Sequence, residues 1–409
     1  MTGILVGYVG ATYSTKPGTP TSVSASATAY NSASVSFTAP FNGGLPIDSY
    51  VATSCPGGIT GSSASSPVSV SGLTGSTSYT FKVKAHNSLG YGCCSSSSGS
   101  ITTPAPPVSA TIMVVAGGGQ GGFVSGGGAG GVVCGTYNLT RGISYTVTVG
   151  GGAPQPTYNC NFYAVYYACC SPPPPARNGN NSSFIGTGLN LTANGGGGGG
   201  LLNACTGASG GSGGGGAPNG GACGGGSGSQ GGRGGGGYPP FPVLGGSGGG
   251  AGGNGYGYYN MCFVTCAVTY RVKIGIVGGI GKTFSLTGHQ VAGGGSRGCY
   301  PTSQYYPYWN GSSLVRYCCI PSVIPGWYGG GGGGRYAGGG NGDGSSGAGN
   351  TGGGGGASSY AGRRAGTGGS GTVFLAAVDT PSCISGASYL GCYCGQKVYR
   401  FTGSGNVKY

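Results

Sequence analysis

Residues able to carry catalysis are scarce in this chain of 409 residues. The acidic residues are Asp48, Asp343 and Asp379, and there is no glutamate. The two histidines are His86 and His289. General acid–base catalysis needs titratable groups held within hydrogen-bond reach of the substrate and of one another. Because the three carboxylates are far apart in sequence, we expect no catalytic residues, no cofactor and no enzyme activity.

A short glycine-rich stretch invites comparison with a phosphate-binding loop. Gly278-Gly279-Ile280-Gly281-Lys282-Thr283 ends in Gly-Lys-Thr, as such loops do. The motif also requires a glycine five residues before Gly281. Ile276 stands there, and no strand-then-helix pattern surrounds it. The sequence therefore does not predict a nucleotide site.

Cysteine is the one abundant reactive residue, with 17 copies. Adjacent pairs occur at Cys93-Cys94, Cys169-Cys170 and Cys318-Cys319. Zinc sites usually combine two closely spaced cysteine pairs, or cysteines with histidines. Only two histidines exist, and Cys392-Tyr393-Cys394 is too short a spacing. We predict disulfides or buried free thiols and no metal site.

Charge and hydropathy restrict the partners. The formal net charge of +14 comes from 17 scattered Lys and Arg, of which Arg363-Arg364 is the densest point. A nucleic-acid binder usually concentrates its basic residues, so we expect weak attraction to acidic polysaccharide or a cell envelope instead. The longest apolar run, 373–378, is too short to cross a membrane. Residues 1–6 lack the basic region of a signal peptide.

Aromatic residues gather in three stretches that are dense in Tyr and Cys: 158–175, 256–270 and 299–328. Exposed Tyr and Trp stack on sugar rings and anchor protein interfaces. These side chains are candidate contacts to a receptor or to another subunit; the alternative is that they form local cores. The candidates are Tyr163, Tyr166, Tyr167, Tyr258, Tyr259, Tyr305, Tyr306, Tyr308 and Trp309.

Within residues 17–104, apolar and polar residues alternate in short segments, as is typical of β-strands. Segments such as 34–38 and 78–85 alternate apolar and polar residues, and turn-rich stretches such as 41–46 separate them. Alternation with regular turn spacing predicts a β-sandwich of about ninety residues.

Specific residues of this region resemble the fibronectin type III family. Pro17-Gly18-Thr19-Pro20 is similar to the start of such a domain, and Leu73-Thr74-Gly75-Ser76-Thr77-Ser78-Tyr79 is similar to its tyrosine corner. Phe37 stands where the family usually carries a core Trp. The resemblance implies a spacer and binding module, with Phe37, Leu73 and Tyr79 defining the fold. It identifies no chemistry.

After a Pro-rich hinge the chain becomes glycine-rich, with 105 glycines in all. Val-rich stretches at 110–116, 144–149 and 372–375 flank the glycine runs, and 398–405 predicts a short final strand. This order resembles the glycine-rich domain of bacteriophage tail and fibre proteins. The Tyr- and Cys-dense stretches depart from that family's small-residue composition.

The glycine runs have two physical interpretations. Polyglycine can form extended helices with three residues per turn, whose backbones hydrogen-bond to one another when packed side by side. The alternative is flexible Gly/Ser linker between small β pieces. Either way the fold class is all-β, with a fibronectin III-like sandwich, short strands in the glycine-rich body and essentially no α-helix.

These observations predict five parts: an N-terminal arm or attachment segment (1–16), the sandwich (17–104), the hinge (105–110), the glycine-rich domain (111–378) and a C-terminal Cys-containing β segment (379–409). The resemblance implies a non-catalytic virion protein of a tailed phage, of the fibre or adhesin type. Its expected partners are other virion proteins, copies of itself, and host polysaccharide or envelope protein. The alternatives are a capsid or tail decoration protein and a subunit of an extracellular filament.

Overall fold

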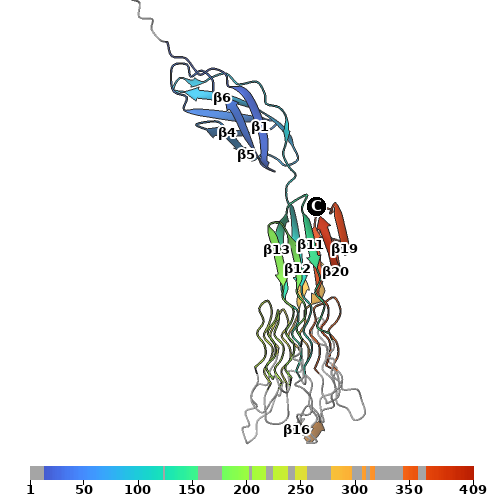
Figure 1. Cartoon of the computed structure of the whole chain (residues 1–409). Coiled ribbons are helices and arrows are strands. Elements are labelled where there is room, and N and C mark those ends of the chain that lie inside the picture. Colours follow the sequence, from blue (N-terminus) through green and yellow to red (C-terminus); the bar gives the residue numbers. More distant parts are fainter. Residues whose placement is uncertain are drawn as a thin grey trace, which may run out of the picture. The chain divides into compact units, whose positions relative to one another are not determined.

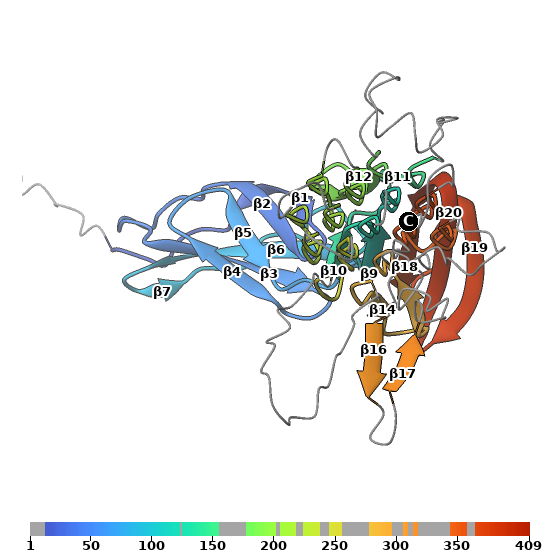
Figure 2. The same cartoon turned by 90° about the horizontal axis from the view of Figure 1, so that it is seen from below.

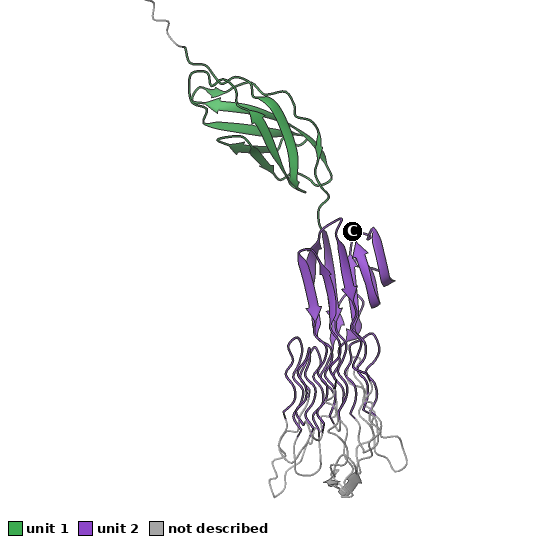
Figure 3. Ribbon diagram, viewed as in Figure 1, with its two compact units in different colours: residues 1–107 green, residues 108–409 purple. Residues whose placement is uncertain are grey.

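The computed structural model describes residues 13–122, 125–154, 177–201, 205–217, 224–237, 245–255, 278–296, 306–309, 314–317, 344–357 and 365–409. These residues form two compact units, Met1–Pro107 and Val108–Tyr409 (Figures 1 and 3). Every regular element in this part of the chain is a strand, which confirms the predicted all-β class.

Unit 1 is a sandwich of two antiparallel sheets. One sheet has the order β1-β2-β5 and the other β4-β3-β6-β7, with β8 also paired to β6. Alternate residues of β6 are buried, as the period of the sequence predicts. The strands are β1 (Thr21–Ala29), β2 (Ser32–Thr38), β3 (Ser49–Cys55), β4 (Thr60–Ser63), β5 (Val68–Ser71), β6 (Ser78–Asn87), β7 (Gly90–Tyr91) and β8 (Ile101–Thr102).

The three residues of unit 1 that the sequence analysis singled out are buried. Phe37 is buried and its ring centroid lies 4.7 Å from that of Tyr50. Leu73 and Tyr79 are buried too, and the Tyr79 hydroxyl accepts a 2.9 Å hydrogen bond from the Thr74 N–H. This bond satisfies a turn amide that the apolar core would otherwise leave without a partner. It is the geometry of the predicted tyrosine corner.

Residues 92–98 follow β6 in an unusual register. The N–H groups of Gly92, Ser95 and Ser98 donate to the carbonyls of alternate residues of β6, those whose side chains are buried. Three residues of this segment therefore cover the length of two residues of β6. The Ser95 and Ser98 hydroxyls accept from the Val83 and Phe81 N–H groups at 2.9 and 3.0 Å. The serine side chains thus replace the carbonyls that a regular strand would present.

Unit 2 begins with an eight-stranded sheet of order β10-β9-β18-β20-β11-β12-β13, from which β19 branches at β20. Residues 397–401 of β20 pair with β18, whereas residues 405–408 pair with β11. The strands are β9 (Val108–Val115), β10 (Val132–Leu139), β11 (Ser144–Thr148), β12 (Ser182–Gly186), β13 (Leu189–Ala193), β18 (Thr372–Ala377), β19 (Cys383–Tyr393) and β20 (Gln396–Lys408). Two short hairpins, β14 (Lys282–Phe284) with β15 (His289–Val291) and β16 (Tyr306–Trp309) with β17 (Leu314–Tyr317), complete the strands.

Two features of this sheet differ from the sequence prediction. The expected hinge extended to residue 110, whereas β9 begins at Val108. The expected C-terminal segment 379–409 supplies β19 and β20, and β20 is a 13-residue strand in the middle of the sheet rather than a short final one. Non-local pairing of this kind leaves no signal in local residue patterns.

The sheet has a core on each face. One core contains Ile112 of β9, Leu375 of β18 and Phe401 of β20. The other packs β14 and β15 against the opposite face of β9 and β18, with Phe284 stacked on Phe374 at 4.9 Å. Residues of β9 and β18 are buried on both faces, which explains their unbroken apolar runs.

A second tyrosine corner lies in unit 2. Leu139 and Tyr145 are buried, and the Tyr145 hydroxyl accepts a 2.8 Å hydrogen bond from the Thr140 N–H. The spacing repeats that of Leu73, Thr74 and Tyr79. Sequence reasoning missed this corner, although the repeated Leu-Thr-x-x-x-Ser-Tyr pattern at 73–79 and 139–145 was a readable signal.

Beyond the sheet, the glycine runs form a bundle of extended helices. Seen along their length, they appear as small triangular coils (Figure 2). The N–H groups of residues 117–122 donate in rotation to three neighbouring segments, so residues three apart reach the same neighbour, as a helix of three residues per turn requires. The bonds are Gly117 to Asn180, Gly118 to Gly369, Gly119 to Gly128, Gln120 to Arg177, Gly121 to Gly366 and Gly122 to Ser125, with N···O distances from 2.8 to 3.0 Å.

The carbonyls of the same run accept from further segments. The Gly117, Gly118 and Gly119 oxygens accept from Gly196, Ala153 and Gly355 respectively. The run therefore has six hydrogen-bonded neighbours and satisfies its backbone without a regular strand. Of the two physical interpretations of the glycine runs, the structure has the polyglycine II-type bundle.

Close approach explains why these positions are glycine. A Cβ added at Gly119 would lie 2.2 Å from the Gly197 oxygen, and one at Gly128 would lie 2.3 Å from the Ser212 oxygen. Real Cβ atoms are essentially never found this close to another heavy atom, so the spacing between helices excludes any side chain at these sites.

Candidate functional site

The bundle brings the ends of many segments to one place. Residues 117–122 run away from β9 and residues 126–131 return to β10, and the same pattern repeats around the bundle (Figure 1). The bundle residues on either side of each undescribed stretch therefore lie at the end of the bundle that is remote from the sheet. These pairs are 122 and 125, 154 and 177, 201 and 205, 217 and 224, 237 and 245, 255 and 278, 296 and 344, and 357 and 365.

Most of the predicted aromatic contacts lie outside the described residues. The stretches 158–175 and 256–270 lie outside the described residues, so the structure does not test whether their tyrosines form a common contact surface. Tyr306, Tyr308 and Trp309 belong to β16, which pairs with β17 in a two-stranded hairpin. The predicted contact residues that lie outside the described residues are Tyr163, Tyr166, Tyr167, Tyr258, Tyr259 and Tyr305.

The titratable residues that the structure describes are spread over separate places. His86 Nδ1 lies 2.7 Å from Asp48 Oδ1, and this contact, with a second from the Ser49 hydroxyl, lowers the pKa of Asp48. Asp379 pairs with Arg141 in unit 2. His289 Nδ1 contacts the Thr287 hydroxyl, while burial and the nearby Arg400 lower the pKa of His289. Among these residues, acid and base groups meet only in ion pairs.

The sequence predicts disulfides or buried free thiols, and the described cysteines agree with only the first of these alternatives. Cys205 is disulfide-bonded. The free cysteines that the structure describes are all exposed, although free cysteine is among the most buried residue types. Within the described ranges, no three His, Cys, Asp or Glu residues group as metal ligands. The exposed free cysteines are Cys55, Cys93, Cys94, Cys134, Cys383, Cys392 and Cys394.

The stretch that resembled a phosphate-binding loop is part of the scaffold. Gly278 and Gly279 lie in the bundle, where a Cβ at Gly278 would meet the Gly294 oxygen at 1.8 Å. Lys282 and Thr283 begin β14 instead of a helix.

In the described part of the chain, no helix is long and apolar enough to cross a membrane.

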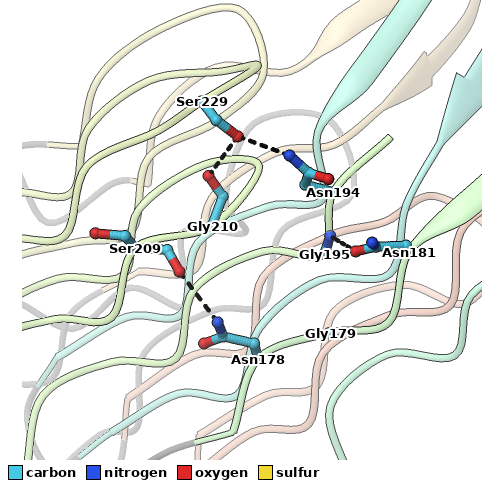
Figure 4. A pocket seen from close by; sticks show the side chains of 8 residues that line it. All are labelled: Asn178, Gly179, Asn181, Asn194, Gly195, Ser209, Gly210 and Ser229. Atoms are coloured by element: carbon cyan, nitrogen blue, oxygen red, sulfur yellow. Dashed lines mark hydrogen bonds between the residues drawn. The ribbon is translucent and has the colours of Figure 1, made fainter. Parts of the chain in front are cut away.

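A shallow, open hollow lined by polar side chains lies on the wall of the bundle (Figure 4). Its volume is about 340 Å³. It lies beside the ends of β12 and β13, where four segments of the bundle run next to one another. The residues that line it are Asn178, Gly179, Asn181, Asn194, Gly195, Ser209, Gly210 and Ser229.

Hydrogen bonds to the backbone hold these side chains in place. Asn181 Oδ1 accepts from the Gly195 N–H at 2.8 Å. Asn178 Oδ1 accepts from the Gly198 N–H at 2.9 Å, and its Nδ2 donates to the Ser209 carbonyl at 3.0 Å. The arrangement ties neighbouring helices together and fixes the direction of each amide.

The second half of the hollow is held in the same way. Asn194 Nδ2 donates to Ser229 Oγ at 3.1 Å, and Ser229 Oγ donates to the Gly210 carbonyl at 3.0 Å. The Asn194 N–H donates to Gln230 Oε1, and Gln230 Nε2 donates to the Thr192 carbonyl. Sequence reasoning missed this site. The clustering of Asn178, Asn180 and Asn181 after a glycine-poor stretch was its weak signal.

Comparison with known proteins gives two domain matches and no match among curated proteins. A crystal structure of titin domains is 28% identical over 22% of this chain and 32% of that chain, with a TM-score of 0.21. The titin kinase with its flanking domains is 29% identical over 22% of this chain and 17% of that chain, with a TM-score of 0.20. The FN1–FN3 domains of chicken CNTN1 are 19% identical over 32% of this chain and 48% of that chain, with a TM-score of 0.21.

The two domain profiles match consecutive parts of the chain. The fibronectin type III domain matches residues 18–102, and the glycine-rich domain matches residues 94–378. The second match covers more than half of the chain. The protein therefore belongs to the glycine-rich domain family, with a fibronectin type III domain preceding its glycine-rich domain.

Proposed function

We propose that the protein is a non-catalytic structural protein of a tailed-phage virion, of the fibre or adhesin type, that contacts the host cell surface. The observation that carries this proposal is the common end of the bundle. A bundle held together by backbone hydrogen bonds presents the ends of its successive segments at one place. Binding residues on loops held by a rigid scaffold are a recurrent arrangement in proteins.

The composition of those segments supports surface contact. The stretches 158–175, 256–270 and 299–328 hold all nine aromatic candidates, and aromatic side chains give much of the binding energy of interfaces. The net charge of +14 favours approach to an anionic envelope. The opposite end of unit 2 begins at Val108, which continues into unit 1 and the expected attachment segment 1–16. The proposed location is an extracellular particle.

Cell binding tests the proposal. We expect the purified chain to bind host cells, and replacement of Tyr306, Tyr308 and Trp309 by Ser to weaken binding at least tenfold. Tyr30→Ser is the control, because Tyr30 is 40% exposed but lies in unit 1. Equal binding by the triple variant would contradict the assignment of these residues. Absence of the chain from purified virions under the electron microscope would contradict the virion location.

One observation favours a second candidate, a decoration or filament subunit that contacts only other proteins. The edge strand β19 is 11 residues long and, although its register is irregular at two places, it contains no charged residue and no proline, two of the usual devices against strand pairing. Pairing with a further chain would make the protein a homo-oligomer or a polymer. Under this candidate Tyr389→Lys on β19 abolishes assembly in sedimentation runs, whereas the triple variant of β16 leaves it intact.

A further inference from the structure

The polar hollow on the bundle wall is separate from the common end of the bundle. We propose that it is a binding site for a neutral saccharide. The site goes beyond the proposed function, because it uses the scaffold rather than the segments at its end. Its five polar side chains are Asn178, Asn181, Asn194, Ser209 and Ser229.

The lining selects the chemical class of the ligand. The hollow holds no charged side chain, so it offers no counter-charge to a phosphate or a metal ion. It also holds no aromatic or large aliphatic side chain to favour an apolar molecule. Amides and hydroxyls combine donors and acceptors, which is the complement of a sugar hydroxyl that both donates and accepts.

Unused hydrogen-bonding capacity points into the same space (Figure 4). Asn181 uses its Oδ1 for the Gly195 N–H, and within the described residues its Nδ2 has no protein partner. Asn194 uses its Nδ2 for Ser229, and its Oδ1 likewise has no partner there. One amide therefore presents free donors and another a free acceptor, each fixed by a bond on its other side.

Fixed geometry reduces the cost of binding. Side chains that are already held by the backbone lose little conformational entropy when a ligand arrives. Asn178 and Asn181 are three residues apart on one extended helix, so they repeat along its wall at about 9 Å. That spacing lets one short oligosaccharide contact both amides, and the volume of about 340 Å³ accommodates part of such a chain.

Affinity electrophoresis of the full chain through native gels containing dextran, mannan or galactan tests the proposal. We expect retardation in at least one gel, and Asn181→Asp to weaken it about tenfold. This variant keeps an oxygen that can accept from the Gly195 N–H, loses the free donor and gains a negative charge. Asn190→Asp is the matched control, because Asn190 is exposed on β13 outside the hollow and gains the same charge.

The outcomes separate this site from the proposed function. Retention of binding by the Tyr306, Tyr308 and Trp309 variant, with loss in Asn181→Asp, supports the hollow. Absence of retardation in all three neutral gels overturns the proposal, as does equal retardation of Asn181→Asp and the native chain. Retardation in a gel that contains heparin, without retardation in the neutral gels, also overturns the proposal, because it would show that the chain binds through its net charge.

Discussion

The sheet and the bundle of unit 2 are built on opposite packing rules. In the sheet, side chains such as Phe184, Phe374 and Phe401 are fully buried and fill the space between layers. In the bundle, backbone lies directly against backbone, and Cβ positions at most interior glycines coincide with neighbouring carbonyls. The chain passes directly between the sheet and the bundle at the strand ends Val115, Val132, Thr148, Ser182, Ala193 and Thr372.

The difference teaches how glycine can build a solid. In the sheet, burial of apolar area offsets the entropy lost on folding. In the bundle there is little apolar area, so the backbone hydrogen bonds and close contacts must offset the large entropy loss of glycine. Each region should then be sensitive to the change that the other tolerates.

The largest effect is expected from a single methyl group inside the bundle. Gly119→Ala places a Cβ 2.2 Å from the Gly197 oxygen, and six bonded neighbours prevent the helix from moving away. We expect a loss of at least about 3 kcal/mol in the free energy of unfolding of unit 2. Differential scanning calorimetry measures it.

Gly224→Ala is the matched control within the same bundle. A Cβ at Gly224 has nothing within 4 Å. The substitution restricts the unfolded chain, so it should leave stability unchanged or raise it by up to about 1 kcal/mol. Equal destabilisation by both variants would show that the bundle does not depend on close backbone contact.

The sheet should show the reverse sensitivity. Phe401→Ala removes a fully buried ring that packs with Ile112 and Leu375 in one core. We expect a loss of about 3–5 kcal/mol, because the cavity cannot close around strands that are hydrogen-bonded on both sides. The thermal transition of unit 1 should stay in place. A shift of both transitions would mean that the two units unfold together.

The paired tyrosine corners compare the same hydrogen bond in two units. Tyr79→Phe and Tyr145→Phe each remove a hydroxyl that accepts from a threonine N–H, at 2.9 and 2.8 Å respectively. Each should cost about 1–3 kcal/mol, because the turn amide loses its partner. The loss should appear in the transition of unit 1 for the first and of unit 2 for the second. A loss of stability in unit 2 for Tyr79→Phe, or in unit 1 for Tyr145→Phe, would contradict the equivalence of the two corners.

Local residue patterns were sufficient for much of this fold. Alternation at 78–85 and the Leu73-to-Tyr79 spacing identified the sandwich, because both depend on neighbours in sequence. Val-rich stretches beside glycine runs located β9, β11 and β18. The central position of β20 and the six neighbours of residues 117–122 depend on pairing between distant segments, which no local pattern records.

The candidate site was harder to find than the fold. Sequence reasoning selected aromatic residues, because their chemistry is recognisable one residue at a time. The polar hollow arises from Asn178, Asn194 and Ser229, which lie on separate helices and meet only through bundle packing. Its residue types are also common in turns, so nothing distinguished them before the helices were placed.

The smallest expected effect concerns the junction of sheet and bundle, where side chains meet backbone. His289 packs against Phe374 at 5.3 Å, and the Arg400 guanidinium donates to the Asn350 carbonyl of a bundle turn at 2.7 Å. Burial, together with Arg400, lowers the pKa of His289 below its ordinary value of 6.5. The folded chain therefore holds His289 neutral where the unfolded chain takes up a proton.

The sign of the pH effect follows from this difference. Above the ordinary pKa both states are neutral, and the stability of unit 2 is at its full value. As the pH falls through 6.5, the unfolded state binds a proton first and unit 2 loses stability. His289→Asn should flatten this part of the profile, measured by thermal melts between about pH 8 and pH 5. An unchanged slope in the variant would show that the junction does not disfavour the charged ring.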